Sequence, residues 1–228
     1  MPSSRNWRKL PWHVRYDLGR RIASALRLSL VEATHLHCRV EIERPVNVGP
    51  GFHLEIPDAG TFIVGRGVNF RRGFVCEIAG NGWVVIGAGS DFTSNALIQC
   101  STRIEIGERC AFGQSVLIVD GQHRYSDPHR HWLEQGHEFH PFRIGDGVGV
   151  SDKCTVQAEI GERAMIASQS VVNRPIPSYS VAAGVPARVT RRFCPGEAPV
   201  PMQAPPTGER TATPAEATRR PESSPVRE

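Results

Sequence analysis

The sequence predicts a parallel β-helix in its middle, with a helical segment before it and a proline-rich tail after it. The first observation is a dipeptide of Val or Ile followed by Gly that begins at residues 64, 86, 106, 144 and 160. The second is an apolar residue or cysteine six and then twelve positions after each of these dipeptides. The third is the composition, because 22 glycines and 18 prolines in 228 residues exceed the usual share of either. A period of six is neither helical nor a simple alternation, so it indicates a repeat architecture.

Residues 1–45 are expected to form a basic amphipathic helical segment. Apolar side chains recur there every four residues, which is helical spacing: Leu10, Val14, Leu18, Ile22 and Leu26. We expect this stripe to pack on one end of the central domain. The alternative is a helix that lies on a membrane surface through residues 1–35. It is suggested by seven basic side chains against one acidic among the first 30 residues, together with two tryptophans.

The central domain spans residues 46–192, and its repeat keeps one phase throughout. The repeating residues form five triplets: Val64, Phe70 and Cys76; Ile86, Phe92 and Ile98; Ile106, Phe112 and Ile118; Ile144, Val150 and Val156; Ile160, Ile166 and Val172. A six-residue unit fits a short strand followed by a tight turn, and three units close one triangular coil. The repeating side chains then point inward and stack from coil to coil, while Gly and small residues occupy the corners.

One coil of the repeat is interrupted by a long excursion. Successive coils begin 22, 20, 38 and 16 residues apart, whereas three six-residue units need 18. The third coil therefore carries about twenty extra residues, in a loop over residues 119–141. This loop is polar and holds five of the nine histidines, namely His123, His129, His131, His137 and His140. A long loop on a rigid repeat is a common place for a functional site.

The composition excludes several classes of protein. No apolar run reaches the ~18 residues that a membrane-spanning helix needs, and a net charge of +4 is too small to indicate a nucleic-acid partner. Six cysteines without CxxC spacing predict reduced thiols. Because no apolar leader is present at the start of the sequence, we expect a cytoplasmic protein. If residues 1–35 bind a membrane, the protein would be peripheral to its inner face. Residues 193–228 hold eight of the prolines and almost no aliphatic side chains, which predicts a disordered tail.

Three stretches resemble the hexapeptide-repeat acyltransferases, in particular the branch of galactoside, maltose and nodulation-factor O-acetyltransferases. They are VLIVDGQHRYSD (residues 116–127), PFRIGDGVGVS (141–151) and SVVNRPIPSYSVAAGVPARVTRR (170–192). The resemblance implies left-handed coiling and a homotrimer whose active sites lie between subunits. It also implies acetyl-CoA or a longer acyl-CoA as donor, a hydroxyl of a sugar, polysaccharide or glycolipid as acceptor, and no metal ion.

The resemblance assigns catalysis to His123, which stands five residues after the inward Ile118. A sugar hydroxyl is a poor nucleophile until a base removes its proton, and imidazole titrates close to neutral pH. Either Asp120 or Asp127 is expected to orient the ring. Asn95 matches a second family position and is expected to bind the acceptor or hold the reacting groups. The alternatives are an ordinary exposed histidine and a corner asparagine in a left-handed turn.

The resemblance also assigns the donor site. The phosphates and long arm of the donor are expected to contact Ser168, Asn173, Arg174, Arg188 and Arg191. The backbone N–H groups near Ser151 and Asp152 are expected to stabilise the oxyanion of the thioester carbonyl. One departure is Gly149, which stands where the family commonly has Trp. The missing wall predicts room for an acyl chain longer than acetyl.

Two other functions stay open on the sequence. Coils of this kind also build metal-dependent carbonic anhydrases, and the loop histidines, His129 with His131 and His137 with His140, could supply imidazole ligands. The closing motif at residues 170–192 favours an acyltransferase over such a hydratase. A non-catalytic scaffold subunit is the other alternative, and His123 argues against it. A fused nucleotidyltransferase is not expected, because no room remains for a nucleotide-binding domain.

Overall fold

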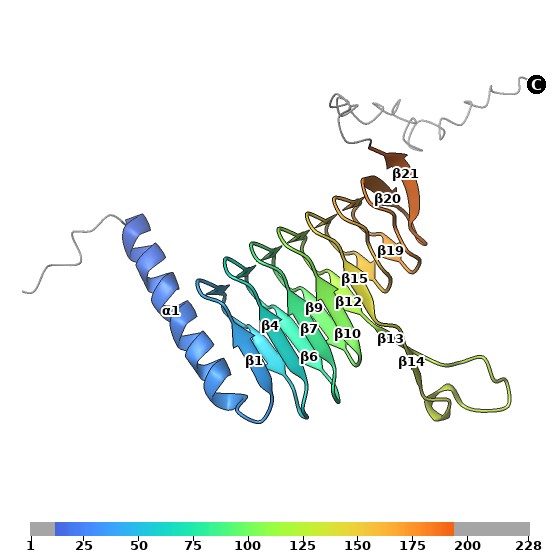
Figure 1. The fold of residues 1–228 in the computed structure, drawn as a ribbon, viewed down its shortest axis with the longest axis horizontal. Coiled ribbons are helices and arrows are strands. Elements are labelled where there is room, and N and C mark those ends of the chain that lie inside the picture. The colour runs from blue at the N-terminus through green and yellow to red at the C-terminus, as the bar shows by residue number, and fades with distance from the viewer. Residues whose placement is uncertain (1–11, 194–228) are drawn as a thin grey trace, which may run out of the picture. The chain divides into compact units, whose positions relative to one another are not determined.

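The computed structural model describes residues 12–193, with side chains from residue 18 onward, so the predicted tail lies outside the described residues apart from its first residue. One helix, α1 (Trp12–Thr34), is followed by short strands that form three sheets along a single column (Figure 1). The predicted fold class, a left-handed parallel β-helix with a helix before it, is confirmed.

Each of the first five coils contributes one strand to each of three sheets, and the sixth contributes strands to sheets B and C only. Sheet A contains β1 (Arg39–Ile42), β4 (Thr61–Val64), β7 (Trp83–Ile86), β10 (Arg103–Ile106) and β15 (Phe142–Ile144). Sheet B contains β2 (Asn47–Val48), β5 (Asn69–Phe70), β8 (Asp91–Phe92), β11 (Ala111–Phe112), β16 (Gly149–Val150), β18 (Met165–Ile166), β20 (Ser180–Ala183) and β21 (Arg188–Arg192). Sheet C contains β3 (His53–Glu55), β6 (Val75–Ile78), β9 (Leu97–Cys100), β12 (Leu117–Val119), β17 (Thr155–Val156) and β19 (Val171–Val172). The excursion contains β13 (Gly121–His123), the 3₁₀ helix η2 (Trp132–Glu134) and β14 (His137–Phe139).

The core is a column of inward side chains with the predicted spacing. All fifteen residues of the five predicted triplets are at most 2% exposed. Equivalent residues lie opposite each other on neighbouring coils, as Phe70 and Phe92 do. Phe92 also stacks on Phe112, with ring centroids 4.6 Å apart. Burial of these side chains supplies most of the stabilisation, because each one removes apolar surface from water.

Helix α1 covers the N-terminal end of the column. Val48 N donates a hydrogen bond to Ser24 Oγ (2.7 Å), and Arg27 Nη1 donates one to Val48 O (3.1 Å). Just after the helix, His35 Nε2 lies 3.1 Å from Leu54 O. These side chains satisfy backbone groups of the first coil, which has no earlier coil to pair with. The helix therefore closes an otherwise open sheet edge.

The face of α1 that packs on the column is not the predicted one. Leu28 is only 3% exposed and Ser24 is buried, whereas Leu18, Ile22 and Leu26 are 49%, 53% and 67% exposed. The predicted stripe therefore faces outward, and its earlier members lie outside the described side chains. The physical reason is that the first coil needs hydrogen-bonding partners, which the apolar stripe lacks. Within the described residues, no helix is long and apolar enough to cross a membrane.

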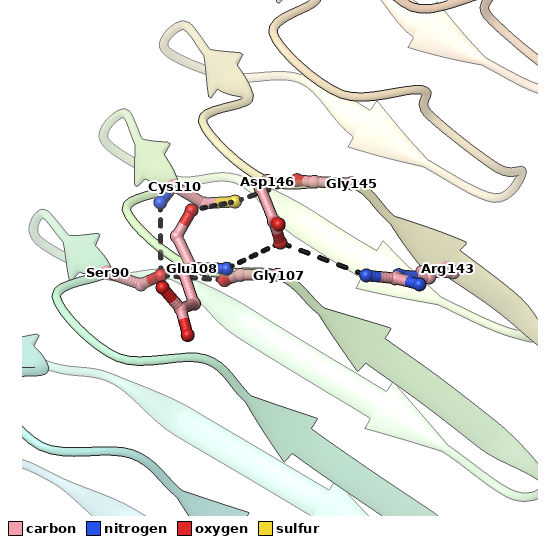
Figure 2. A network of polar contacts seen from close by, with 7 residues as sticks. All are labelled: Ser90, Gly107, Glu108, Cys110, Arg143, Gly145 and Asp146. Carbon is pink, nitrogen blue, oxygen red and sulfur yellow. Dashed lines mark hydrogen bonds and ion pairs between the residues drawn. The ribbon is translucent and has the colours of Figure 1, made fainter.

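Hydrogen-bonded corners hold successive coils together, and Figure 2 shows one of them between sheets A and B. Ser90 Oγ accepts a hydrogen bond from Cys110 N (3.1 Å), and the Asp146 carboxylate accepts one from Glu108 N (3.0 Å). Asp146 follows the excursion and the other three residues precede it, so this corner ties together the coils on either side of the loop. Strand β15 accordingly returns onto β10 in register despite the long insertion.

The C-terminal end of the column is finished by a strand of opposite direction. β21 pairs antiparallel with β20, after a turn that contains Gly184 at a φ of +103°. All five residues of β21 are exposed. Sheet B therefore ends in an antiparallel strand rather than in another coil.

Candidate active site

The predicted excursion is a β-hairpin that projects from the column after β12 (Figure 1). β13 and β14 pair antiparallel, and η2 lies in the connection between them. Gly121 permits this pairing, because a Cβ there would lie 2.5 Å from the Phe139 ring. At the base, His140 N donates a hydrogen bond to Asp120 O (2.7 Å). The hairpin thus begins and ends at the corner between sheets C and A.

Asp120 anchors the hairpin to the preceding coil. Its side chain is 4% exposed, and its carboxylate accepts hydrogen bonds from Ser101 N (2.9 Å), Thr102 N (2.6 Å) and Thr102 Oγ1 (2.7 Å). These donors belong to the turn between β9 and β10, one coil before the hairpin. A charged acceptor that satisfies two backbone N–H groups stabilises this turn and fixes where β13 starts.

Neither aspartate that we expected to orient the His123 ring contacts it within the described chain. The Asp120 carboxylate is used by the turn at Ser101, and Asp127 Oδ1 accepts a hydrogen bond from His129 N (2.9 Å). Within the described residues, the predicted aspartate–histidine pair is not formed. Backbone N–H groups occupy both oxygens of Asp120, and the Asp127 carboxylate binds the backbone of its own loop through Oδ1.

His123 lies instead in an aromatic cluster at the end of β13. Its ring centroid is 4.1 Å from that of His137, which stands directly opposite on β14. The Trp132 ring approaches edge-on, with centroids 4.8 Å apart. These packing contacts limit the orientations that the exposed His123 ring can adopt. They place the imidazole at the outer rim of the hairpin, where a ligand can reach it.

A cleft of about 530 Å³ lies beside this cluster. The hairpin supplies one wall with His123, His137 and Phe139, and sheet C supplies the other with Glu77 and Gln99. Gln99 Nε2 donates a hydrogen bond to Glu77 Oε2 (2.8 Å), which fixes the two side chains relative to each other. The cleft combines an imidazole, a carboxylate, an amide and an aromatic ring. This combination suits a ligand with several hydroxyl groups.

Glu77, Gln99 and Trp132 are site residues that the sequence analysis did not assign, and it considered His137 only as a possible metal ligand. For Glu77 and Gln99 a signal existed, because each directly follows the third inward residue of its coil and so faces outward beside the loop. For Trp132 and His137 no signal existed. Their place depends on how the two arms of the hairpin pair, and the repeat says nothing about that pairing.

Asn95 lies on a different corner from His123. It occupies the B–C corner, by which we mean the turns that lead from a strand of sheet B to the next strand of sheet C. Its φ is +61°, and the equivalent residues of the following coils are also left-handed: Ser115, Lys153 and Gln169, at +57°, +58° and +62°. Asparagine tolerates this conformation better than most residues. The geometry therefore supports the alternative of a corner asparagine, and within one chain Asn95 does not line the cleft beside His123.

Ser151, Asp152 and Ser168 lie on the same B–C corner, in later coils. Ser151 N donates a hydrogen bond to Ile166 O (2.9 Å), as part of the ladder between coils. The expectation that this N–H stabilises an oxyanion is therefore wrong, because the ladder already uses it. The Asp152 N–H has no hydrogen-bond partner among residues 12–193, and its carboxylate accepts a hydrogen bond from Gln114 N (2.6 Å). Of the two predicted oxyanion donors, only the Asp152 N–H is free.

The remaining predicted donor residues lie elsewhere on the column. Asn173 and Arg174 follow β19, on the same C–A side as the hairpin, and Asn173 lines a smaller cleft of about 180 Å³ with Gln122 and His140. Arg188 and Arg191 are exposed on β21. Within one chain, the predicted donor residues are therefore spread over two corners and the last strand, and they do not form one site.

The wall that we expected to be missing at Gly149 is replaced from the next coil. Met165 lies opposite Gly149 in sheet B, and a Cβ built on Gly149 would be 2.5 Å from Met165 Sδ. The Met165 side chain is 44% exposed. A flexible thioether thus occupies the space next to Gly149 that a larger side chain would otherwise fill.

The four buried cysteines of the described chain lie in environments that favour the protonated thiol: Cys76, Cys100, Cys110 and Cys154. Burial raises the pKa of the Cys76 thiol well above its usual range, and burial together with the Asp120 charge raises that of Cys100 to about 12. Burial also raises the pKa values of Cys110 and Cys154. A thiol held protonated is a poor nucleophile and a poor metal ligand. Within the described residues, no group of three His, Cys, Asp or Glu side chains is placed to hold a metal ion.

Curated relatives match part of the sequence, while no known protein-family model matches it. A probable acetyltransferase of Mycobacterium tuberculosis is 34% identical over 90 residues, which are 39% of this chain and 30% of that protein. Serine acetyltransferase of Haemophilus influenzae is 34% identical over 89 residues, which are 39% of this chain and 32% of that enzyme. The chain thus spans about a third of the length of the curated relatives it matches.

Solved structures share the fold over most of the column. A hexapeptide-repeat acetyltransferase of Vibrio cholerae, complexed with acetyl-CoA, gives a TM-score of 0.51 at 21% identity and covers 74% of this chain and 76% of that one. AntD, an N-acyltransferase of Bacillus cereus in complex with dTDP and 3-hydroxybutyryl-CoA, gives 0.59 at 13% identity and covers 72% and 87%. With the curated relatives, these structures confirm the predicted resemblance to the hexapeptide-repeat acetyltransferases.

Proposed function

We propose that this hexapeptide-repeat β-helix transfers an acyl group from acyl-CoA to a hydroxyl of a sugar, polysaccharide or glycolipid, with His123 as general base. The observation that carries the proposal is the position of His123 at the rim of a cleft whose other wall is polar. In this reaction the imidazole takes the proton of the acceptor hydroxyl as its oxygen attacks the thioester carbonyl. The C–S bond then breaks, the imidazolium gives its proton to the departing sulfur, and CoA leaves as the thiol while the acceptor oxygen keeps the acyl group as an ester.

The walls of the cleft would bind the acceptor. Glu77 and Gln99, held together by their hydrogen bond, offer acceptors and a donor to hydroxyl groups of a sugar ring. Phe139, which is 40% exposed, offers an aromatic face to the apolar side of such a ring. His123 then meets a hydroxyl that the other contacts have already positioned. Positioning of this kind lowers the barrier because it removes rotational freedom before the reaction.

The donor would approach from a neighbouring copy in a homotrimer. Asn95, Asp152 and Ser168 lie on the B–C corner, whereas His123 lies beyond the C–A corner. The two corners of one column face different directions, so one chain does not bring these residues to the cleft. Two copies with parallel columns can place the B–C corner of one against the hairpin of the next. The donor phosphates would then meet Arg174, Arg188 or Arg191, whose guanidinium groups are exposed.

Release of CoA from acetyl-CoA, measured with a panel of sugars, amino sugars and lipid-linked glycans, tests the reaction and separates O- from N-acylation. We expect His123→Ala to lower kcat by roughly 10²–10⁴-fold with the best acceptor, because a general base contributes about that much. His129→Ala is the matched control, since His129 is an exposed histidine of the same loop outside the cleft. Unchanged turnover in His123→Ala would exclude His123 as the base. Absence of CoA release with every acceptor would favour the scaffold alternative, and activity that depends on zinc would favour the hydratase.

Complementation tests whether the site lies between copies. His123→Ala and Arg188→Ala chains, each expected to be inactive alone, are co-expressed with different affinity tags and purified as mixed trimers. Arg188 pairs with Ala183 at the B–C end of β20, so it would serve the hairpin of the neighbouring copy. If His123 and Arg188 serve one site from two copies, one of the three sites in each mixed trimer holds both native residues. If one chain supplies both residues, the mixture stays inactive.

A further inference from the structure

We propose that α1 binds the surface of an anionic phospholipid bilayer, with its outward apolar face in the membrane and an arginine-lined cleft beneath it at the lipid phosphates. This proposal goes beyond the reaction and does not depend on it. It rests on three features of the described part of the helix: the outward face, the cleft beside it and the charge around the cleft.

The outward face of α1 is apolar and uncharged over three turns. Leu18, Ile22, Leu26 and Leu30 follow one another at four-residue steps, and between 49% and 67% of each residue is exposed. The exposed residues that lie beside this row on the helix surface are small and uncharged: Gly19, Ala25, Ser29 and Ala33. At 1.5 Å per residue the row is about 18 Å long and covers about a third of the helix circumference. Four large aliphatic side chains in one row are more than a surface helix normally leaves in water.

A basic cleft of about 640 Å³ lies where the helix meets the first two coils. Arg20 and Arg21 line it from the helix, and Arg44 lines it from the turn after β1. Leu28 and Val68 contribute apolar lining at its floor. A cleft with guanidinium groups and an apolar floor matches a phosphate ester that carries hydrocarbon.

The described side chains around this cleft carry a net positive charge. Of the three arginines that line the cleft, Arg44 is paired with a carboxylate: its Nη2 donates two hydrogen bonds, of 2.9 and 3.0 Å, to Glu32. Arg20 and Arg21 are exposed and make no ion pair with any described side chain. Arg21 also lies on the helix surface between the cleft and the apolar row, since one residue turns the helix by about 100°. Apolar burial and attraction to anionic headgroups can therefore act at the same time.

The opposite face of α1 is already occupied, which leaves the outward face for a partner. Ser24 and Arg27 bind the backbone of the first coil, and Leu28 joins the core. A change on the outward row therefore removes no contact that holds the helix on the column. Membrane binding can be tested without disturbing the fold.

Vesicle flotation of the full chain tests the proposal. We expect binding to vesicles of phosphatidylcholine with 30% phosphatidylglycerol at 0.1 M NaCl, and weak binding to pure phosphatidylcholine. Ile22→Glu with Leu26→Glu should reduce the bound fraction at least tenfold, because two charges would enter the apolar layer. Arg20→Gln with Arg21→Gln should reduce it about 25-fold, at roughly fivefold for each charge near an anionic surface. This second loss should shrink in 0.5 M NaCl.

The matched control is Arg109→Gln with Arg163→Gln, which removes the same charge from exposed corners of later coils. Flotation of this control should equal that of the wild type. Equal flotation of the Ile22/Leu26 variant and the wild type would overturn the proposal, as would failure of the wild type to float. A change in molar mass of the Ile22/Leu26 variant by light scattering would also overturn it, because the row would then be covered by a second copy. Circular dichroism verifies that each variant is folded.

Discussion

Removal of the Asp120 carboxylate should loosen the base of the hairpin while the rest of the column stays intact. In Asp120→Ala, Ser101 N and Thr102 N lose their acceptor at a turn that is only half-exposed. Each partly buried donor without a partner costs about 1–3 kcal/mol, so the expected loss in unfolding free energy is about 2–5 kcal/mol. Asp120→Asn keeps one oxygen for Thr102 and loses mainly the charge, so it should cost about 1–2 kcal/mol.

Two measurements check this expectation. Guanidinium denaturation gives the change in unfolding free energy, and hydrogen exchange followed by mass spectrometry reports the amides of residues 101 and 102 directly. In Asp120→Ala, exchange at these two amides should become faster, whereas exchange in β4, which makes no hydrogen bond to this turn, should stay unchanged. Asp152→Ala is the matched control, since it also removes a carboxylate that accepts a backbone hydrogen bond, at Gln114 N (2.6 Å), but away from the hairpin. It should leave exchange at residues 101 and 102 unaltered.

The reasoning would be refuted by a specific result. If Asp120→Ala unfolds at the wild-type guanidinium concentration and residues 101 and 102 remain protected, the carboxylate does not hold the turn. Because the turn positions the start of β13, activity offers a second readout. A loosened hairpin should raise KM for the acceptor and lower kcat together, and Asp120→Asn should recover part of both.

Three further expectations follow from the core, the thiols and the sheet B wall. Phe92→Ala removes the ring between Phe70 and Phe112, and denaturant titration should show a loss of about 3–5 kcal/mol in unfolding free energy. The control, Val181→Ala, lies outside the core column and should cost much less. The raised thiol pKa values mean that, above about pH 9, the unfolded chain loses thiol protons that the folded chain keeps. Unfolding free energy should therefore fall as pH rises from about 9 towards 12, and Cys100→Ser should flatten this fall; a pH-independent midpoint over that range would contradict the assignment. Met165→Ala should raise turnover with octanoyl-CoA relative to acetyl-CoA, and an unchanged ratio would show that the space at Gly149 does not contact the acyl chain.

Much of the fold could be predicted because the repeat is local information. An inward residue every six positions determines both the strand and its register, as the pairs Val64–Ile86 and Phe70–Phe92 show. One further coil obeys the same spacing at Ile42, Val48 and Leu54, but its first inward residue is followed by Glu rather than Gly, so the dipeptide search passes over it.

The helix and the hairpin were harder to predict because their contacts are not local. A four-residue apolar period predicts a helix with one apolar face, but it does not show whether that face packs against the column. Here the backbone groups of Val48 in the first coil require hydrogen-bond partners, and the side chains of Ser24 and Arg27 supply them. The position of His123 could be predicted from the interrupted repeat. Its neighbours His137 and Trp132 depend on the pairing within the hairpin, which no periodicity encodes.

The closed ends of the column have a consequence for assembly. A stack of parallel coils with bare ends can add another copy end to end without limit, and so form a fibre. Here α1 binds the backbone of the first coil, and an antiparallel strand finishes sheet B at the other end. Growth along the column axis is therefore blocked at the first coil and disfavoured at the last. Contact between copies of this chain is therefore directed to the faces and corners of the sheets rather than to the ends of the column.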